Sequence, residues 1–600
     1  MPTSLSFKSL ILFSVFSSFI SQANNYTLTI TNAKHHLANI EVTFKDVRTK
    51  AFTVKLPVWR SGRYEILDLS SNIRDFQAFD ASGKSLTWHQ DDKNTWRIFV
   101  NTPGYVKVKY QVYANQLRNR VSHIDATHAY LDASGVFMYS PSQRDKALTV
   151  KLNVPNDWKS VSGMDSIDEH QFTASNYDQL VDSPIESGIH QFDSIKVEAQ
   201  TYEIVIWGKG NYDMQRLKKD IKKLHYQAKA LWKTFPYTRY VYMYHVGDKL
   251  RGATEHVNST IIQTDRLGFA PDKKYRKVIG TTAHEFIHTW NVKAYRPAGI
   301  SPYNYDKENY SDLFWMAEGT TSYYDNLFNV RAGIYTTEQY LENMAEDINT
   351  FQNKPGRNVM SLSQSSFNTW LNNDANRRHN TTVSIYLKGS LVSWLLDKEI
   401  RAATNNKKSL DDLSLLLFQK YGKSKQGYTS YNVKQLLKEI TNKDFSPFWN
   451  DYVEGINEIN FNELLNFYGL TIKTGNKDDN NKVSMGWKTK TANNIIELTL
   501  VDTNGAAFNA GLAAGDEVVA IDNMQIKDNL DEIIENLKVD QSYEIHYFNQ
   551  GLMKQTTITP QVAPPEKLKI IAVKKPTKTQ KQHFKSWLKQ DIKSAFKNDK

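Results

Sequence analysis

Residues 284–288 of the chain read His-Glu-Phe-Ile-His and decide the fold of the region around them. The segment 273–293 holds no proline, so we predict a single helix across it. Residues four apart lie on one helix face, which lets the imidazoles of His284 and His288 converge on one zinc ion. Glu285, next to the first imidazole, can then reach the open coordination position and take a proton from water. On its own, the same pattern also fits two histidines on a protein surface.

Glu318 is the leading candidate for the third protein ligand that a catalytic zinc ion requires. It lies in the amphipathic stretch 313–325, whose apolar face would bury it beside the first helix. A carboxylate buried among Trp, Phe and Met residues loses its hydration, which is costly unless it pairs with a cation or binds a metal. Asp325 lies seven residues further on, on the same helix face two turns later. We interpret Asp325 as a hydrogen-bond acceptor for a ligand histidine, with an exposed acid at the helix end as the alternative.

The size and composition of the chain indicate a globular protein with several domains. Its 600 residues exceed the roughly 250 to 300 at which a single hydrophobic core stops growing. Hydrophobic residues make up 40% of the chain and aromatic residues 12%, which is enough apolar surface to exclude global disorder. The chain has no cysteine, so any metal must be held by nitrogen or oxygen ligands.

The first 23 residues have the features of a signal peptide. Lys8 precedes the apolar run 10–20, and Ser21-Gln22-Ala23 supplies the small residues at which signal peptidases cut. The run is about half of the roughly 20 residues that a membrane-spanning helix needs, and a short membrane anchor is the alternative. We therefore predict cleavage after Ala23, export to a periplasm or full secretion, and no transmembrane helix in the mature protein.

Hydrophobic patterning divides the mature chain into four segments, and the fold class that we predict is a multidomain α+β protein. Short alternating runs such as residues 106–112 predict an N-terminal antiparallel, β-sandwich-like domain over residues 24–197. Longer helical periodicity predicts a mainly helical domain over residues 198–456. Residues 457–562 return to short strands, and residues 563–600 form a basic C-terminal extension.

The net charge of +11 comes mostly from this extension, where residues 567–600 hold eleven lysines against two aspartates. No part of the sequence resembles a nucleic-acid-binding fold, so we expect no nucleic-acid partner. Apolar residues recur at helical spacing among the lysines: Phe584, Trp587, Leu588, Ile592 and Phe596. We predict that this helix docks onto the protein, and adsorption to an anionic membrane is the alternative.

Three strings of residues make the chain resemble the PDZ-containing glycyl aminopeptidases, a metallopeptidase family of the gluzincin clan. They are Leu-Pro-Val-Trp-Arg-Ser-Gly-Arg-Tyr at 56–64, the zinc motif with its continuation Trp-Asn-Val-Lys at 290–293, and Trp-Met-Ala-Glu-Gly at 315–319. The resemblance covers most of the chain and implies that the helical segment is a thermolysin-like catalytic domain. It also implies one zinc ion per chain, held by the two histidines and Glu318, with Glu285 as the catalytic residue.

The resemblance also points to residues outside the zinc motif. Gly252-Ala253-Thr254-Glu255 looks like the Gly-x-x-Glu segment that gluzincin aminopeptidases place along the substrate, with the glutamate holding the free amino group. An ammonium group removed from water needs a charged partner, and holding it fixes how far the peptide reaches toward the metal. Thr254 stands where relatives usually carry a larger apolar residue, and an exposed turn acid is the alternative for Glu255.

Tyr386, in the string Tyr-Leu-Lys-Gly at 386–389, resembles the tyrosine whose phenol stabilises the oxyanion in related aminopeptidases. With 32 tyrosines in the chain, a packing role is the alternative. Residues 511–522 look like the turn and strand of a PDZ domain, which binds extended peptides at a sheet edge. A PDZ-like domain over residues 457–562 would either recruit a peptide ligand or pack on the catalytic domain without one.

Together these features predict a zinc aminopeptidase that hydrolyses N-terminal bonds of peptides or proteins, and the resemblance implies a preference for small first residues such as Gly or Ala. Two alternatives stay open. A zinc endopeptidase would have no ammonium group for Glu255 to bind, and a peptide-binding PDZ protein would keep only a residual metal site. The sequence does not define the oligomeric state.

Overall fold

The structure is a computed structural model that describes residues 23–118, 121–371, 374–424, 426–474, 482–565 and 567–596. The predicted signal peptide lies outside the described residues except for Ala23. Two compact units make up the chain: residues up to 310 together with 420–427, and residues 311–419 together with those from 428 onward. Within the described ranges, no helix is both long and apolar enough to cross a membrane.

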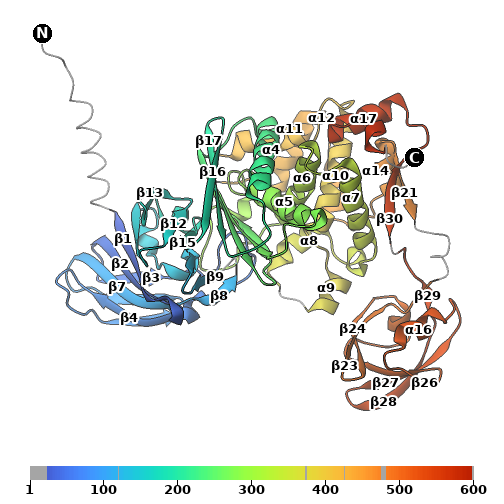
Figure 1. The fold of residues 1–600 in the computed structure, drawn as a ribbon, viewed down its shortest axis with the longest axis horizontal. Helices are drawn as coiled ribbons and strands as arrows, with labels where there is room; N and C mark the ends of the chain where they lie inside the picture. Colours follow the sequence, from blue (N-terminus) through green and yellow to red (C-terminus); the bar gives the residue numbers. More distant parts are fainter. Residues whose placement is uncertain are drawn as a thin grey trace, which may run out of the picture. The chain divides into compact units, whose positions relative to one another are not determined.

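The N-terminal segment folds as the predicted β domain, and its largest sheet has seven strands in the order β13-β14-β11-β1-β2-β7-β4 (Figure 1). In β2, Leu37–Val47, apolar residues alternate with more polar ones, so Ile40, Val42 and Phe44 share one buried face. Neighbouring strands are antiparallel except for β1 and β11, which run parallel. The other strands are β1 Asn24–Asn32, β4 Ile73–Phe79, β7 Gly104–Tyr113, β11 Leu148–Asn153, β13 Asp165–Asp168 and β14 Gln171–Ala174.

Two smaller sheets complete this domain. One has the order β3-β6-β5, and the other has the order β12-β15-β10-β9-β8. In the second of these, β9, Val121–Ile124, and β10, His128–Leu131, form an antiparallel hairpin. The remaining strands are β3 Ala51–Lys55, β5 Trp88–Asp92, β6 Thr95–Phe99, β8 Asn115–Arg118, β12 Lys159–Ser162 and β15 Ile185–Gly188.

A further sheet, in the order β16-β17-β18-β20-β19, supports the helix of the His-Glu-x-x-His motif. This helix is α5, Asp272–Ile287, and it packs on β19 and β20. Residues 240–247 of the central strand β18 are all buried, because β18 lies between two parallel neighbours. The other elements are β16 Gln191–Val197, β17 Gln200–Trp207, β18 Arg239–Gly247, β19 Gly252–Glu255, β20 Ser259–Asp265 and α4 Met214–Trp232.

These strands refine the fold prediction. The middle region is helical as predicted, and its first part, residues 200–265, contains four strands beside one long helix. A strand that is buried on both faces has a continuous apolar run without alternation, so its sequence does not differ in period from that of a buried helix.

The second unit is built mainly from helices. Glu318 lies in a short π-helical turn, Trp315–Gly319, which continues directly into α6, Thr320–Arg331. Helix α10, Leu387–Ala403, meets this turn at two glycines: a Cβ added to Gly319 would lie 2.4 Å from the Cα of Gly389. Only residues without a side chain permit two backbones to approach so closely. Further helices of this region are α7 Thr337–Gln352, α11 Leu410–Tyr421 and α12 Ser430–Thr441.

The C-terminal sheet is inserted between two strands that pair with each other. Strand β21, Leu470–Thr474, pairs with β30, Leu568–Ala572. The residues between them contain a sheet in the order β23-β24-β25-β27-β28 with its own apolar core. The domain boundaries at 457 and 562 stay predictions. The strands in this order are β23 Trp487–Ala492, β24 Ile495–Val501, β25 Glu517–Ile521, β27 Tyr543–Asn549 and β28 Leu552–Ile558, and the short β26, Met524–Gln525, pairs with β25 beside them.

The helix predicted in the basic extension is α17, Lys578–Leu588, and it docks onto the helices of its own unit. Trp587 is fully buried and stacks on Trp394 and Tyr468. Its indole N–H donates to the hydroxyl oxygen of Tyr323 at 2.9 Å. The docking prediction for this helix is therefore confirmed.

Replacing residues 475–567 by a short glycine-containing turn should leave the rest of the protein folded, because Thr474 and Leu568 already pair across β21 and β30. Deleting residues 475–600 should instead destabilise the helical unit, since it also removes Trp587, and the loss of a buried tryptophan costs about 3–5 kcal/mol. Thermal unfolding followed by circular dichroism compares the two truncated chains with the parent. Equal melting temperatures for the two truncations would contradict the structural role of α17.

Candidate active site

The two histidines and the glutamate of the motif lie at the C-terminal end of α5. His284 is in the last turn, and His288 follows the helix as its C-cap with helical backbone angles, φ −58° and ψ −21°. The ring centroids of the two histidines are 4.7 Å apart. Glu285 and His288 are buried, and His284 is half-buried. The helix predicted over residues 273–293 is therefore confirmed as far as Ile287, where it ends six residues early, and its last turn brings both imidazoles together.

A backbone carbonyl fixes the protonation of His288. The Nδ1 atom of His288 lies 2.9 Å from the carbonyl oxygen of Asn291. A carbonyl oxygen can only accept a hydrogen bond, so Nδ1 carries the proton and Nε2 presents a lone pair. In metal sites, the ring nitrogen of a ligand histidine that does not bind the metal donates a hydrogen bond of this kind, and this bond orients the ring.

Glu255, Glu285 and His288 converge from two elements of the same unit. Glu255 is the last residue of β19, and it is 5% exposed. Each of the three residues offers a ligand atom, and these atoms all lie within 4.8 Å of one another. The candidate base and the candidate acceptor of an amino group therefore lie beside one candidate metal ligand.

Glu318, the predicted third ligand, lies in the second unit, whereas His284 and His288 lie in the first. Glu318 is 3% exposed and comes from the π-helical turn, an irregularity that frequently marks functional positions in helices. Two imidazole nitrogens and one carboxylate oxygen are a donor set that catalytic zinc takes, so the residues present fit this metal.

The other predicted residues lie at the start of helices or on an edge strand. Tyr386 precedes α10, is 43% exposed, and comes close to the turn of Glu318 through the contact of Gly389 with Gly319. Gly252 and Ala253 lie on β19, the outermost strand of its sheet.

Asp325 is half-buried on α6, on the side of the helix that faces Asp347. Burial and the charge of Asp325 raise the pKa of Asp347 to about 7. His288 already donates a hydrogen bond from Nδ1 to the carbonyl oxygen of Asn291. Asp325 would therefore accept a hydrogen bond from the other ligand histidine, His284, and this role stays a prediction.

Family models match two parts of the chain. Residues 25–189 match the Peptidase M61 N-terminal domain, and residues 277–392 match the M61 glycyl aminopeptidase. The resemblance to the glycyl aminopeptidases is thus confirmed over these two regions, and the chain is a metallopeptidase.

Solved structures resemble this chain to different degrees. An aminopeptidase N family protein from Idiomarina loihiensis is 26% identical, covers 94% of this chain and 100% of its own, and has a TM-score of 0.86. An M1 zinc metallopeptidase from Deinococcus radiodurans is 13% identical, covers 73% of this chain and 94% of its own, and has a TM-score of 0.47. A search of curated proteins finds no match.

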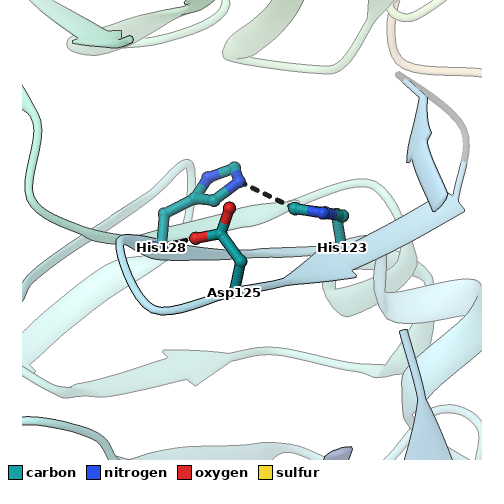
Figure 2. Close-up of side chains that lie close together, drawn as sticks. All are labelled: His123, Asp125 and His128. Atoms are coloured by element: carbon teal, nitrogen blue, oxygen red, sulfur yellow. Dashed lines mark hydrogen bonds between the residues drawn. The ribbon is translucent and has the colours of Figure 1, made fainter. Parts of the chain in front are cut away.

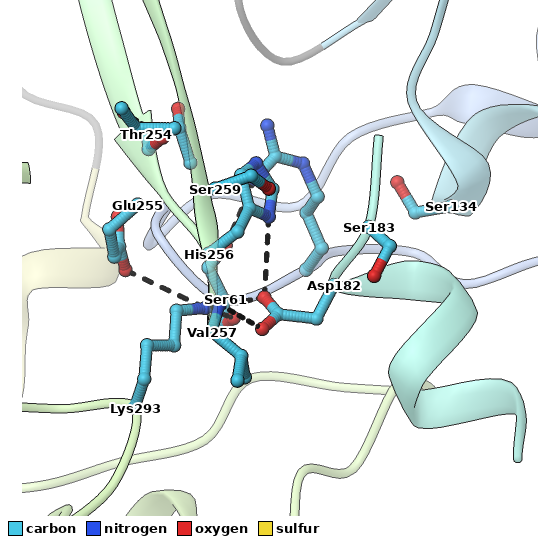
Figure 3. A network of polar contacts seen from close by, with 12 residues as sticks. Ser61, Ser134, Asp182, Ser183, Thr254, Glu255, His256, Val257, Ser259 and Lys293 are labelled. Carbon is cyan, nitrogen blue, oxygen red and sulfur yellow. Dashed lines mark hydrogen bonds and ion pairs between the residues drawn. The ribbon is translucent and has the colours of Figure 1, made fainter. Parts of the chain in front are cut away.

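The chain also has a buried network of polar contacts beside Glu255 that the sequence did not reveal (Figure 3). The ammonium group of Lys293 donates to Asp182 Oδ1 at 2.6 Å and to Ser61 Oγ at 2.7 Å. It also lies 4.0 Å from Glu255 Oε1. His256 Nδ1 lies 3.3 Å from the same oxygen of Asp182. The only signal for Lys293 and Ser61 in the sequence was their place in the strings at 290–293 and 56–64.

The charges of this network persist at neutral pH. Burial acts to lower the pKa of Lys293, but Asp182 above all, with Tyr303 and Glu255, raises it overall. Burial acts to raise the pKa of Asp182, but Lys293 and His256 hold this pKa well below its usual range. A fixed cation therefore lies beside Glu255.

Gly62 packs directly against the carboxylate of Glu255. Its φ of +88° is in the left-handed region, and a Cβ there would lie 2.7 Å from Glu255 Oε2 and 2.6 Å from Thr254 Cγ2. Any side chain at this position would strain the backbone and displace Glu255. The loop of the N-terminal β domain thus forms one wall around Glu255.

Substituting Lys293→Met should lower the free energy of unfolding by about 3–5 kcal/mol, because it removes the lysine cation that compensates the buried carboxylate of Asp182. Adding Asp182→Asn should recover part of this loss, since the second change removes the buried charge. Urea-induced unfolding measures both variants beside Lys93→Met, a control in which the exposed pair with Asp68 is lost at a cost below about 1 kcal/mol. A loss for Lys293→Met as small as that of the control would contradict the role of this ion pair.

Proposed function

We propose that the chain is an exported zinc aminopeptidase that hydrolyses the first bond of peptides or proteins with a free amino terminus. The observation that carries the proposal is the convergence of Glu255, Glu285 and His288 within 4.8 Å. A metal ligand, a base and a carboxylate for an ammonium group then lie within reach of the first residue of one substrate.

In this proposal one zinc ion is held by His284, His288 and Glu318, whose donor atoms suit it. Zinc, when bound, polarises the peptide carbonyl and lowers the pKa of a water molecule. Asn291 keeps His288 in the tautomer that carries its lone pair on Nε2. We assign the matching hydrogen bond of His284 to Asp325.

Glu285 carries the proton between the reacting groups. Its carboxylate takes a proton from the attacking water and delivers it to the nitrogen of the leaving amine. Its place next to His284 on α5 and its burial keep bulk water from competing for that proton. A positioned base of this kind contributes a factor of about 10² to 10⁴ in rate.

Glu255 binds the ammonium group at the end of the peptide. An extended peptide can lie along β19 past Gly252 and Ala253, because this strand is the outermost of its sheet. Lys293 at 4.0 Å holds the carboxylate in place, and the wall at Gly62 limits the space beside it. A wall so close to the ammonium site supports the preference for Gly or Ala as the first residue.

Tyr386 is the proposed donor to the oxyanion. Its position at the start of α10, beside the turn of Glu318, and its exposed ring support this role. An oxyanion donor contributes about 2.7–4 kcal/mol to the lowering of the barrier.

The inserted C-terminal sheet is proposed to be a PDZ-like domain that recruits peptide ligands. Its turn at 511–522 is held by Asp516, which is 1% exposed and accepts hydrogen bonds from the backbone of Ala513 at 2.8 Å and from Asn549 Nδ2 at 2.7 Å. If this domain recruits substrate, the chain with residues 475–567 replaced hydrolyses a dipeptide at the parent rate and long peptides more slowly. Equal rates on both would leave the sheet with a structural role.

The Glu285→Gln variant should keep about one zinc ion per chain at the α5 site and lose hydrolysis by a factor of at least about 10², because the amide accepts no proton. Metal analysis and an assay with an alanine arylamide measure the two properties on the same sample. Glu169→Gln, an exposed acid in the N-terminal domain, is the control and should keep both. Hydrolysis at the parent rate by Glu285→Gln would refute its role as the base.

A peptide with a free amino terminus should be cleaved and its acetylated twin should not. Acetylation removes the ammonium group and leaves Glu255 unpaired, which costs about 2 to 5 kcal/mol. This corresponds to a loss of roughly thirtyfold to several thousandfold in kcat/KM.

Glu255→Gln should reduce this difference by slowing cleavage of the free peptide, and Glu169→Gln again serves as the control. If the parent enzyme cleaved both peptides equally at an internal bond, the aminopeptidase proposal would be wrong and the activity would be that of an endopeptidase. Absence of zinc from the parent and from every variant would favour a peptide-binding protein instead.

A further inference from the structure

A second cluster of histidines lies on the β9–β10 hairpin of the N-terminal domain (Figure 2). This hairpin belongs to a different sheet from the one that supports α5. His123 is on β9, Asp125 is in the turn, and His128 begins β10. His128 is fully buried, and His123 is 9% exposed. One ligand atom from each of the three residues lies within 4.8 Å of the others.

A chain of hydrogen bonds behind His128 fixes which of its nitrogens carries the proton. Gln263 Nε2 lies 3.4 Å from His245 Nδ1, and His245 Nε2 donates to Glu186 Oε2 at 2.9 Å. The other oxygen of Glu186 lies 2.9 Å from His128 Nδ1, so this nitrogen also donates to the carboxylate. His128 Nε2 is therefore a lone-pair donor, and it points away from the buried network.

This lone pair faces a second imidazole. His128 Nε2 lies 3.0 Å from His123 Nδ1, the contact drawn in Figure 2. The indole ring of Trp207 stacks on the ring of His128 at 3.7 Å and donates to Thr127 Oγ1 at 3.0 Å. Both the orientation and the tautomer of His128 are thus set by its surroundings.

Asp125 adds an oxygen donor to the two nitrogens. Its Oδ1 accepts hydrogen bonds from the backbone N–H of Thr127 at 2.7 Å and of His128 at 3.1 Å, which lock the carboxylate in the turn. Figure 2 shows the second carboxylate oxygen on the side of the two rings.

We propose that His123, Asp125 and His128 bind a second divalent transition-metal ion, for which zinc is the probe. Two imidazole nitrogens and one carboxylate oxygen suit this class of ion, and the pairing of His128 with Glu186 is the carboxylate–histidine–metal arrangement of ligand histidines. The ion would take the place of the proton between His123 Nδ1 and His128 Nε2. It would tie β9, the turn and β10 together.

The test uses the full-length chain with His284→Ala and His288→Ala, in which the α5 site cannot hold metal. This double variant should retain about one zinc ion per chain after gel filtration. Adding His123→Ala should remove it. The matched control adds His89→Ala and Asp91→Asn, which removes an exposed pair with the same His-x-Asp spacing in the same domain and should leave zinc bound.

Two conservative variants keep the test decisive if His123→Ala does not fold. Asp125→Asn retains the acceptor for the turn hydrogen bonds but loses the charge, and it should weaken zinc binding in a calorimetric titration. Glu186→Gln should weaken it by about 10- to 100-fold, the effect of losing a hydrogen-bonded carboxylate behind a ligand histidine.

A folded double variant that binds no zinc would overturn the proposal, and so would a bound zinc ion that none of the changes at His123, Asp125 and Glu186 affects. The outcome separates this site from the proposed function. If the unmutated chain holds one zinc ion and the loss of His284 and His288 leaves its amount unchanged, the aminopeptidase proposal fails and the hairpin site stands.

Discussion

The candidate active site depends on one constraint, which is that each buried carboxylate needs a compensating positive charge or hydrogen-bond donor. Glu255, Glu285 and Glu318 are each 7% exposed or less, and a carboxylate without hydration is stable only beside a cation, a hydrogen-bond donor or a metal. Lys293 provides a fixed cation for Glu255, and it is itself held by Asp182 and Ser61. In the proposed enzyme the zinc ion and the ammonium group of the substrate supply the other positive charges. The same requirement thus connects folding, metal binding and substrate choice.

The N-terminal β domain takes part in the site rather than merely preceding it. Its loop supplies Ser61 to the ammonium group of Lys293 and places Gly62 against Glu255. In both candidate metal sites a hydrogen-bond acceptor fixes the tautomer of one histidine and leaves the lone pair on the opposite nitrogen. The acceptor is the Asn291 carbonyl for His288 and Glu186 for His128.

Local spacing was enough to predict α5 and its convergent histidines, because residues four apart on a helix meet whatever the rest of the fold does. It was not enough for Lys293, whose partners Asp182 and Ser61 lie 111 and 232 residues away. Strands β21 and β30 are also far apart in sequence, so their pairing could not be predicted and the basic extension was predicted as a separate segment. Strand β18 was missed because burial on both faces removes the alternation that marks a strand.

Diffraction from crystals of the zinc-loaded protein, collected at the zinc absorption edge, tests the central claim most directly, since two possible ligand groups share His288. The account predicts an anomalous peak about 2.0–2.2 Å from His288 Nε2, a nitrogen of His284 and an oxygen of Glu318, with Glu285 and Glu255 outside the coordination sphere. A peak bound instead by His288, Glu285 and Glu255 would contradict it, because the base and the ammonium acceptor would then both be occupied by the metal.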